Sequence, residues 1–177
     1  MKKAVTLAWI LLAFMCGCLL AQAPPMPKPA PELQRLHYFV GEWKNEGNMK
    51  ASPWGPGGKY TGTDHGSMLG DFFLVLHSEG TGPMGAMKDL AVMSFDPKEK
   101  VYTYHDYSNM GMEQSSKGTV SDKTWTWLSE EEFGGKKMKG RFVLTEVSST
   151  SYTYSYDTSD DGKSWTNMME GKATKVK

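Results

Sequence analysis

The sequence predicts an all-β fold, a closed antiparallel barrel of about ten strands that follows a short N-terminal helix. Short segments rich in Thr, Tyr, Trp, Val and Phe recur along the chain and are separated by turn residues, which is typical of a β-sandwich or barrel. After residue 40 the apolar residues show almost no helical periodicity. The connections are short, so we expect an up-and-down meander whose closure removes the exposed edges of the sheet.

The chain is expected to divide into a signal peptide at 1–23, a Pro-rich linker at 24–31 and a barrel domain at 32–177. Two lysines precede an apolar run that is too short to span a bilayer comfortably, as in an export signal. We therefore expect an exported protein of the periplasm or the extracellular space.

The processing site of this signal has two readings. Small residues at Ala21 and Ala23 offer the pattern that signal peptidase cleaves, after either residue. Alternatively, Gly17 and Cys18 resemble a lipid-anchor site, and acylation of Cys18 would tie a lipoprotein to the membrane. A membrane partner is expected only in that second case.

Composition excludes some functions. The chain carries 20 basic and 20 acidic residues without long single-sign blocks, so it offers no electrostatic footprint for nucleic acid. Both cysteines, Cys16 and Cys18, fall in the expected signal peptide. The mature chain would then have no disulfide and must be stabilised by its hydrophobic core.

The expected elements follow from apolar periodicity and turn residues. A helix is expected at 32–40, with Leu33, Leu36 and Val40 on one stripe. The strands are expected at 41–50, 60–69, 72–80, 89–95, 101–108, 113–120, 124–131, 137–147, 151–157 and 164–174.

The first expected strand shows which way its side chains point. Trp43 alternates with charged residues such as Glu42 and Lys44, so the charged face meets water and Trp43 faces inward. Its large ring can fill the closed end of a barrel. The last expected strand repeats this alternation from Trp165 onward, and the first and last strands are neighbours in a closed meander. We therefore expect Trp165 on the same inner wall.

Gly41 and Trp43 after a short helix resemble the signature at the start of lipocalin-type barrels, and the segment 36–47 resembles the family known as domain of unknown function 1579. Further similar motifs, in chain order, are Gly70-Asp71-Phe72-Phe73-Leu74, Phe95-Asp96 with Tyr102, Asp106 with Met110-Gly111, and Asp161-Gly162 with Trp165. The resemblance implies a lipocalin-like barrel in an exported bacterial protein, with no established activity.

The nitrobindin-like haem barrels also begin with a Gly-x-Trp element, but they bind haem through a His near the carboxyl end. Here the last histidine is His105, and the terminal strand offers Met168 and Met169 instead. No cofactor is therefore predicted.

Two histidines, His65 and His77, fall on neighbouring expected strands joined near Gly70. A two-residue turn would pair Asp64 with His77, whereas a three-residue turn would put both histidines on one face. A His pair with Asp64 has the chemistry of an acid and base or of a metal site, but hydrogen-bonded strand residues are the simpler interpretation. No catalytic residue and no metal ligand is predicted, and the sequence has no nucleophile motif.

A ten-stranded barrel is wider than its side chains alone can fill, so some aromatic stripes should border a cavity. We expect a small apolar or amphipathic molecule to bind there. His105 and Asp106 are adjacent and point to opposite sides of their strand, so only one of them can face the lumen. The predicted ligand-binding residues are Trp43, His77, Met93, His105, Asp106, Trp127, Phe142, Tyr154 and Trp165.

Two other functions stay open at this point. A fully packed barrel would favour an envelope-associated interaction or scaffold protein, especially if it carried a large exposed apolar patch. An enzyme would be favoured if His65, His77 and Asp64 met in one wet cleft.

Overall fold

The chain forms one closed sheet in the computed structural model, which describes residues 27–52, 55–133 and 135–176. The signal peptide expected at 1–23 and the alternative lipid anchor at Cys18 lie outside these residues. Within the described part, no helix combines the length and the apolar character needed to cross a membrane.

All ten expected strands are present, and their ends differ by a few residues from the expectation. They are β1 (Gly41–Met49), β2 (Gly58–Leu69), β3 (Phe73–Gly82), β4 (Gly85–Asp96), β5 (Val101–Ser108), β6 (Glu113–Ser121), β7 (Thr124–Phe133), β8 (Lys136–Ser148), β9 (Ser151–Ser159) and β10 (Thr166–Lys175). The largest difference is at β4, which begins at Gly85 rather than at residue 89. Its first residues pair with the end of β3 across a two-residue turn that brings Gly82 opposite Gly85.

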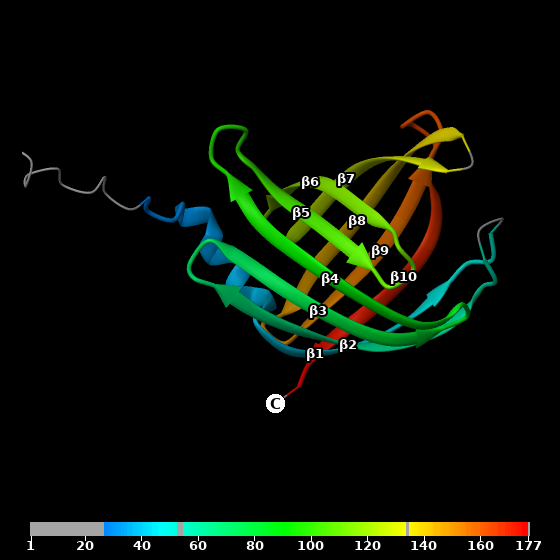
Figure 1. Cartoon of the computed structure of the whole chain (residues 1–177), viewed down its shortest axis with the longest axis horizontal. Helices are drawn as coiled ribbons and strands as arrows, with labels where there is room; N and C mark the ends of the chain where they lie inside the picture. The colour runs from blue at the N-terminus through cyan, green and yellow to red at the C-terminus, as the bar shows by residue number, and fades with distance from the viewer. Residues whose placement is uncertain (1–26, 53–54, 134, 177) are drawn as a thin grey trace, which may run out of the picture.

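Each strand pairs antiparallel with the next, and β10 returns to pair with β1 (Figure 1). The closing register runs from Trp43 opposite Lys175 to Met49 opposite Met169. The predicted closed meander is therefore confirmed. Closure leaves no strand of the barrel with an unpaired edge.

A 3₁₀ helix, η2 (Pro31–Phe39), precedes β1 where a helix was expected at 32–40. Three residues per turn place Leu33, Leu36 and Phe39 on its buried face. The expected stripe was wrong in its last member, Val40, because that residue follows the helix with extended backbone.

Figure 1 shows η2 at one end of the barrel. The four largest side chains that are fully buried lie in the core at this end, where η2 packs against the strands; they are Trp43, Trp125, Leu36 and Leu74. The Nε1–H group of Trp43 donates a hydrogen bond of 3.1 Å to the carbonyl oxygen of Phe39, so its indole is both buried and satisfied. Exposed Glu42 and Lys44 flank it in sequence, which confirms the predicted inward face of β1.

The two ends of the barrel are built differently. Short turns at 70–72, 97–100, 122–123 and 149–150 lie at the η2 end. The connections at 83–84, 109–112 and 160–165 lie at the opposite end. We call the η2 end the floor and the opposite end the mouth.

Candidate functional site

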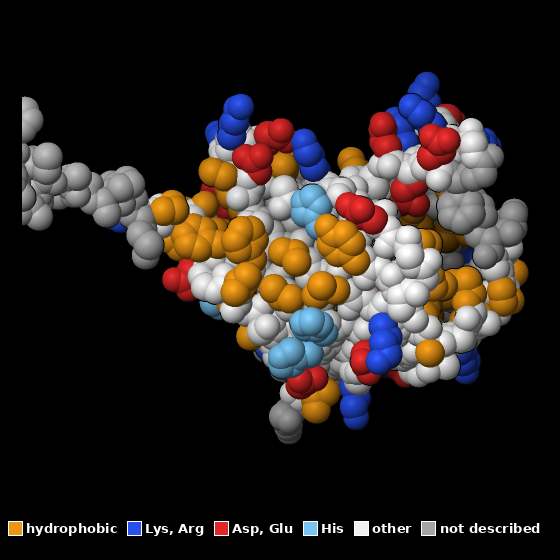
Figure 2. Space-filling model, in the orientation of Figure 1, with side chains coloured by type: hydrophobic (Ala, Val, Ile, Leu, Met, Phe, Trp, Pro, Cys, Tyr) orange, Lys and Arg blue, Asp and Glu red, His pale blue; other side chains and the backbone are white. Residues whose placement is uncertain are grey.

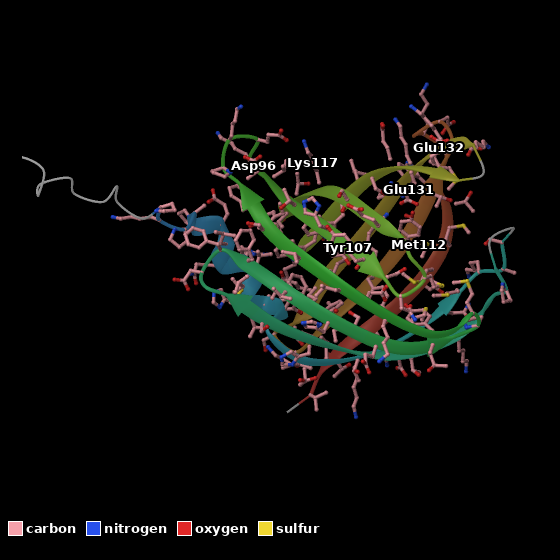
Figure 3. All side chains as sticks on the ribbon, in the orientation of Figure 1. Asp96, Tyr107, Met112, Lys117, Glu131 and Glu132 are labelled. Carbon is pink, nitrogen blue, oxygen red and sulfur yellow. The ribbon has the colours of Figure 1, made fainter. Side chains whose placement is uncertain are left out.

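The strands enclose more space than their inward side chains fill. A cavity of about 780 Å³ is lined by residues from Phe39 at the floor to Met112 and Glu132 toward the mouth. Figure 3 shows Met112 and Glu132 on the side of the barrel away from η2. Sites for small molecules typically measure roughly 300–1,000 Å³. The alternative of a fully packed barrel is therefore wrong.

One wall of the cavity is aromatic. The rings of Tyr104 and Trp127 lie 5.7 Å apart, and those of Phe142 and Tyr154 lie 5.8 Å apart. Trp127 also stacks on Trp125 of the core at 6.2 Å, so the wall continues into the packed floor. These faces offer a ligand a rigid apolar surface.

Glycine makes room for the largest of these rings. Gly118 faces Trp127 in the register of β6 and β7, and a Cβ atom added to Gly118 would overlap the indole. The sheet therefore accepts an inward tryptophan here only because the position opposite has no side chain.

A second wall carries three aspartates. Asp64 on β2 and Asp89 on β4 both face Ser78 of the intervening strand. Asp106 on β5 is two residues from Ser108, which faces Asp89. Asp89 and Asp106 are diagonal neighbours, which lie roughly 7–8 Å apart in a sheet. Asp64 lies two strands from Asp89 on the same inner face, and we call the three residues the acidic wall.

Burial is the main cause that raises the pKa of each of these aspartates. The charge of Asp64 further raises the pKa of Asp89. The charge of Asp89 helps to raise the pKa of Asp106 to about 6. Side-chain hydrogen bonds with Asn45 and Ser78 act in the opposite direction on Asp64 and lower its pKa.

A fourth carboxylate, that of Glu131 on β7, is satisfied by its neighbours. Its Oε1 atom accepts hydrogen bonds from the hydroxyl of Tyr156 at 2.7 Å, from Oγ of Ser129 at 2.8 Å and from the side-chain amide of Gln114. Burial and the hydrogen bond to Glu131 both raise the pKa of Tyr156 above its ordinary value. Oε1 of Glu131 is therefore satisfied, whereas Oδ1 of Asp106 has no hydrogen-bond partner among the described residues.

The described residues that line the cavity include no Lys, Arg or His. Asp64, Asp89, Asp106 and Glu131 occupy inward positions of their strands. The other acidic lining residues occupy outward positions of their strands and border the cavity at its rim; they are Glu79, Glu113, Glu130 and Glu132. The cavity combines apolar faces with a surplus of negative charge.

Five of the predicted ligand-binding residues line this cavity: Met93, Asp106, Trp127, Phe142 and Tyr154. Trp43 also faces inward, but it belongs to the packed floor and does not border the open space.

The prediction that His77 and His105 face the lumen is wrong, because both imidazoles are exposed on the outer surface. Asp106 takes the inward position that excludes His105, since adjacent strand residues point to opposite faces. His77 is turned outward by the register of the β2–β3 hairpin, in which Ser78 faces the inward Asp64. Figure 2 shows histidine and apolar side chains side by side on this outer face.

The inward placement of Trp165 is also wrong. The pairing of β9 with β10 shifts between Asn167, which faces Asp157, and Met169, which faces Tyr156. This bulge reverses the alternation, so Asn167 and Trp165 point outward although Met169 points inward. Trp165 instead packs against Arg141 on the outer face of β8, with the guanidinium carbon 4.2 Å from the centroid of the indole ring.

The hairpin of β2 and β3 has the three-residue turn, with Leu69 opposite Phe73 and His65 opposite His77. The two histidines therefore share the outer face, while Asp64 lies inside the barrel. The site of an enzyme that would use all three residues is thus not formed. In the described ranges, no group of three His, Cys, Asp or Glu side chains is arranged to hold a metal ion.

Several lining residues were absent from the predicted set: Asn45, Tyr60, Asp89, Tyr104, Gln114, Glu131, Tyr156 and Met169. The alternation of Tyr102, Tyr104 and Asp106 on one face of β5 was the available signal for Tyr104. An isolated aspartate such as Asp89 reads as an outward residue in sequence, because carboxylates are rarely buried.

These features define the chain as a ten-stranded closed β-barrel with an aromatic and acidic lumen. The chain belongs to the family described as "Protein of unknown function (DUF1579)", whose profile matches residues 28–175. The resemblance to domain of unknown function 1579 noted in the sequence is therefore confirmed.

The solved structures that match the chain share little sequence with it. Rv2717c from M. tuberculosis is 12% identical, with a TM-score of 0.58 over 85% of this chain and 100% of that chain. The structure of EF1p2_mFAP2b bound to DFHBI is 10% identical, with a TM-score of 0.46 over 81% of this chain and 98% of that chain. No curated protein sequence matches the chain significantly.

Proposed function

We propose that this protein binds a small amphipathic molecule inside its barrel. The observation that carries the proposal is the cavity of about 780 Å³, walled by aromatic rings and a few inward polar groups. Affinity would come from burial of the apolar part of the ligand, and orientation from hydrogen bonds to the polar wall. The lining residues Met93, Trp127 and Phe142 would form the apolar contact.

Blocking the cavity tests this proposal. Ser116 on β6 lines the cavity, whereas Thr119 on the same strand is exposed and faces outward. Ser116→Trp and Thr119→Trp therefore add the same side chain inside and outside the barrel. The probe is N-phenyl-1-naphthylamine, whose fluorescence rises in apolar surroundings.

We expect the wild-type protein and Thr119→Trp to bind the probe equally, and Ser116→Trp to bind it at least ten-fold more weakly. Circular dichroism of both variants controls for folding. Equal binding by the two variants, or no binding by the wild type, would exclude the cavity as the site.

An interaction role is the second candidate, favoured by an apolar strip on the outer face over β3 to β5 (Figure 2). The strip consists of Phe73, Val75, Leu90, Val92 and Tyr107, of which Phe73, Leu90 and Tyr107 are exposed. Contact between two copies of the chain would cover it. Analytical ultracentrifugation of the wild type and of Leu90→Glu tests this role. The role requires that the wild type forms a dimer at higher concentration and that the variant stays monomeric.

We also propose that the protein is exported, with ligand binding in the periplasm or outside the cell. The support is the lysine pair, the apolar run and the small residues at Ala21 and Ala23. Mass spectrometry of protein secreted by its own host would identify the mature N-terminus. A chain that begins at Cys18 with added acyl groups would establish a lipoprotein instead.

A further inference from the structure

We propose that the ligand is a small amphipathic cation, an amine whose ammonium group lies against Asp89 and Asp106 and whose apolar body lies along the aromatic wall. This inference rests on the proposed function, because it assigns a chemical class to the molecule that the cavity binds. It depends on three features of the lumen: its charge, an unpaired acceptor and the position of the aromatic rings.

The first feature is the lack of any internal counter-charge. Buried carboxylates are usually paired with Lys or Arg, because an isolated charge in a low-dielectric site is costly. No basic side chain lines the described part of this cavity. The basic partners lie elsewhere, as in the pairs of Lys88 with Glu79 and of Lys172 with Glu46, all of them exposed. The inward aspartates thus lack the neutralising group that an ammonium ion would supply.

The second feature is a free acceptor on Asp106. Its Oδ1 atom is buried and, within the described residues, has no hydrogen-bond partner. A buried acceptor without a donor costs free energy of about 1–3 kcal/mol. An ammonium group carries up to three N–H donors and no acceptor, so it satisfies Oδ1 and the carboxylate of Asp89 together. A carboxylate ligand would add charge repulsion instead.

The third feature is the aromatic wall beside these acids. Tyr104 lies close enough to all three aspartates for their charges to act on it, since Asp106, Asp89 and Asp64 each help to raise its pKa. Its ring lies 5.7 Å from that of Trp127, so the acidic and aromatic walls meet at this position. A cation here gains attraction to the ring faces in addition to the carboxylates.

Acidic side chains also border the cavity toward the mouth. Glu113, Glu130 and Glu132 border the cavity, and Figure 3 shows Glu131 and Glu132 at the end away from η2. These glutamates are balanced from outside the cavity, since Glu130 faces Lys139 and Glu132 faces Lys137 in the register of β7 and β8. The inner wall, and not the mouth, therefore provides the selection for a cation.

The test is calorimetric titration of the full mature chain with three probes that share one ring system. These are 2-(1-naphthyl)ethylamine, 2-(1-naphthyl)ethanol and 1-naphthylacetate, which are cationic, neutral and anionic at pH 7.5. We expect the amine to bind at least ten-fold more tightly than the alcohol and the acetate to bind most weakly.

Two variants locate the charge that matters. Asp106→Asn keeps the shape of the side chain and removes its charge, while Asp71→Asn removes one charge from an exposed turn at the floor. We expect Asp106→Asn to weaken binding of the amine by five-fold or more and to leave the alcohol unchanged. Asp71→Asn is expected to change neither affinity.

An alcohol that binds as tightly as the amine, or equal effects of the two variants, would overturn the cationic assignment. Failure of the amine to bind would overturn it as well. Each result is separable from the proposed function, since N-phenyl-1-naphthylamine binding that is blocked by Ser116→Trp would still establish the cavity as a binding site.

Discussion

The hydroxyl groups of Tyr60 and Tyr154 meet 2.7 Å apart although the two residues belong to β2 and β9, with β1 and β10 between them. The rings reach each other because the two positions between them in this row of the sheet are Gly47 and Gly171. Two tyrosines thus span the place where the barrel closes. From the inside of the barrel they link β2 to β9 across the first and last strands, β1 and β10.

Gly171→Ala should destabilise the barrel at this closure. A Cβ atom at position 171 would lie 2.6 Å from the hydroxyl oxygen of Tyr60 and 2.7 Å from that of Tyr154. Such overpacking typically costs about 1–3 kcal/mol. We expect a lower free energy of unfolding by that amount in urea titration.

A double-mutant cycle identifies the cause of that loss. Tyr154→Leu shortens the side chain that the new methyl group meets, so the double variant should lose less stability than the sum of the single variants. Additive losses would mean that the effect of Gly171→Ala arises at Tyr60 or in the backbone and not at Tyr154.

Stability should fall as pH rises from about 4 to about 6. Asp106 has a folded-state pKa of about 6, above the ordinary value of about 3.9, so the folded chain binds its proton more tightly than the unfolded chain. The negative charge of Asp89 on β4 also raises the pKa of Asp106. Gln114, which faces Asp106 on β6, is uncharged and does not oppose this effect. The loss attributable to Asp106 is about 2 kcal/mol between these pH values.

Thermal unfolding of Asp106→Asn measures this contribution. The variant should melt roughly 4–8 °C above the wild type at pH 7.5 and at nearly the same temperature at pH 4.5. Binding of the amine probe should show the opposite pH dependence, because the ammonium group needs the ionised carboxylate. Equal melting temperatures at pH 7.5 would contradict the account given for Asp106.

Removing the outer histidines should leave ligand binding unchanged. His77 and His105 are exposed, and neither borders the cavity. The double variant His77→Ala/His105→Ala is expected to bind N-phenyl-1-naphthylamine within two-fold of the wild type. Trp127→Leu, which alters the inner wall, serves as the positive control and should bind it markedly more weakly.

The two tryptophans expected on the inner wall should differ in their effect on stability. Trp43 is only 1% exposed, so Trp43→Ala should cost about 3–5 kcal/mol in the free energy of unfolding. Trp165 packs on Arg141 outside the barrel, so Trp165→Ala should cost about 1 kcal/mol or less. Similar losses in the two variants, measured by urea titration, would contradict these placements.

Sequence patterns predicted the number and order of the strands and the inward face of β1 well. The reason is local, since alternation between Trp43 and its charged neighbours is visible within four residues and allows only one orientation. The turn residues likewise lie beside the strands that they separate.

Features that depend on register between distant strands were not predicted. A change of one residue in a turn or a bulge reverses every side chain that follows, and neither the turn after Leu69 nor the bulge between Asn167 and Met169 has a distinct local signature. His77 and Trp165 were misplaced for this reason. Asp89 was missed because nothing in its own segment reveals the acidic residues that join it across the sheet.

The contrast between floor and mouth separates the parts of the chain that maintain the fold from those that meet the ligand. Trp43 and Leu36 belong to the packed core at the floor and stabilise the fold there. The residues around the opening contribute little to this core. Substitutions around the opening can therefore accumulate without threatening folding. Homologues with the same scaffold are expected to diverge there in what they recognise.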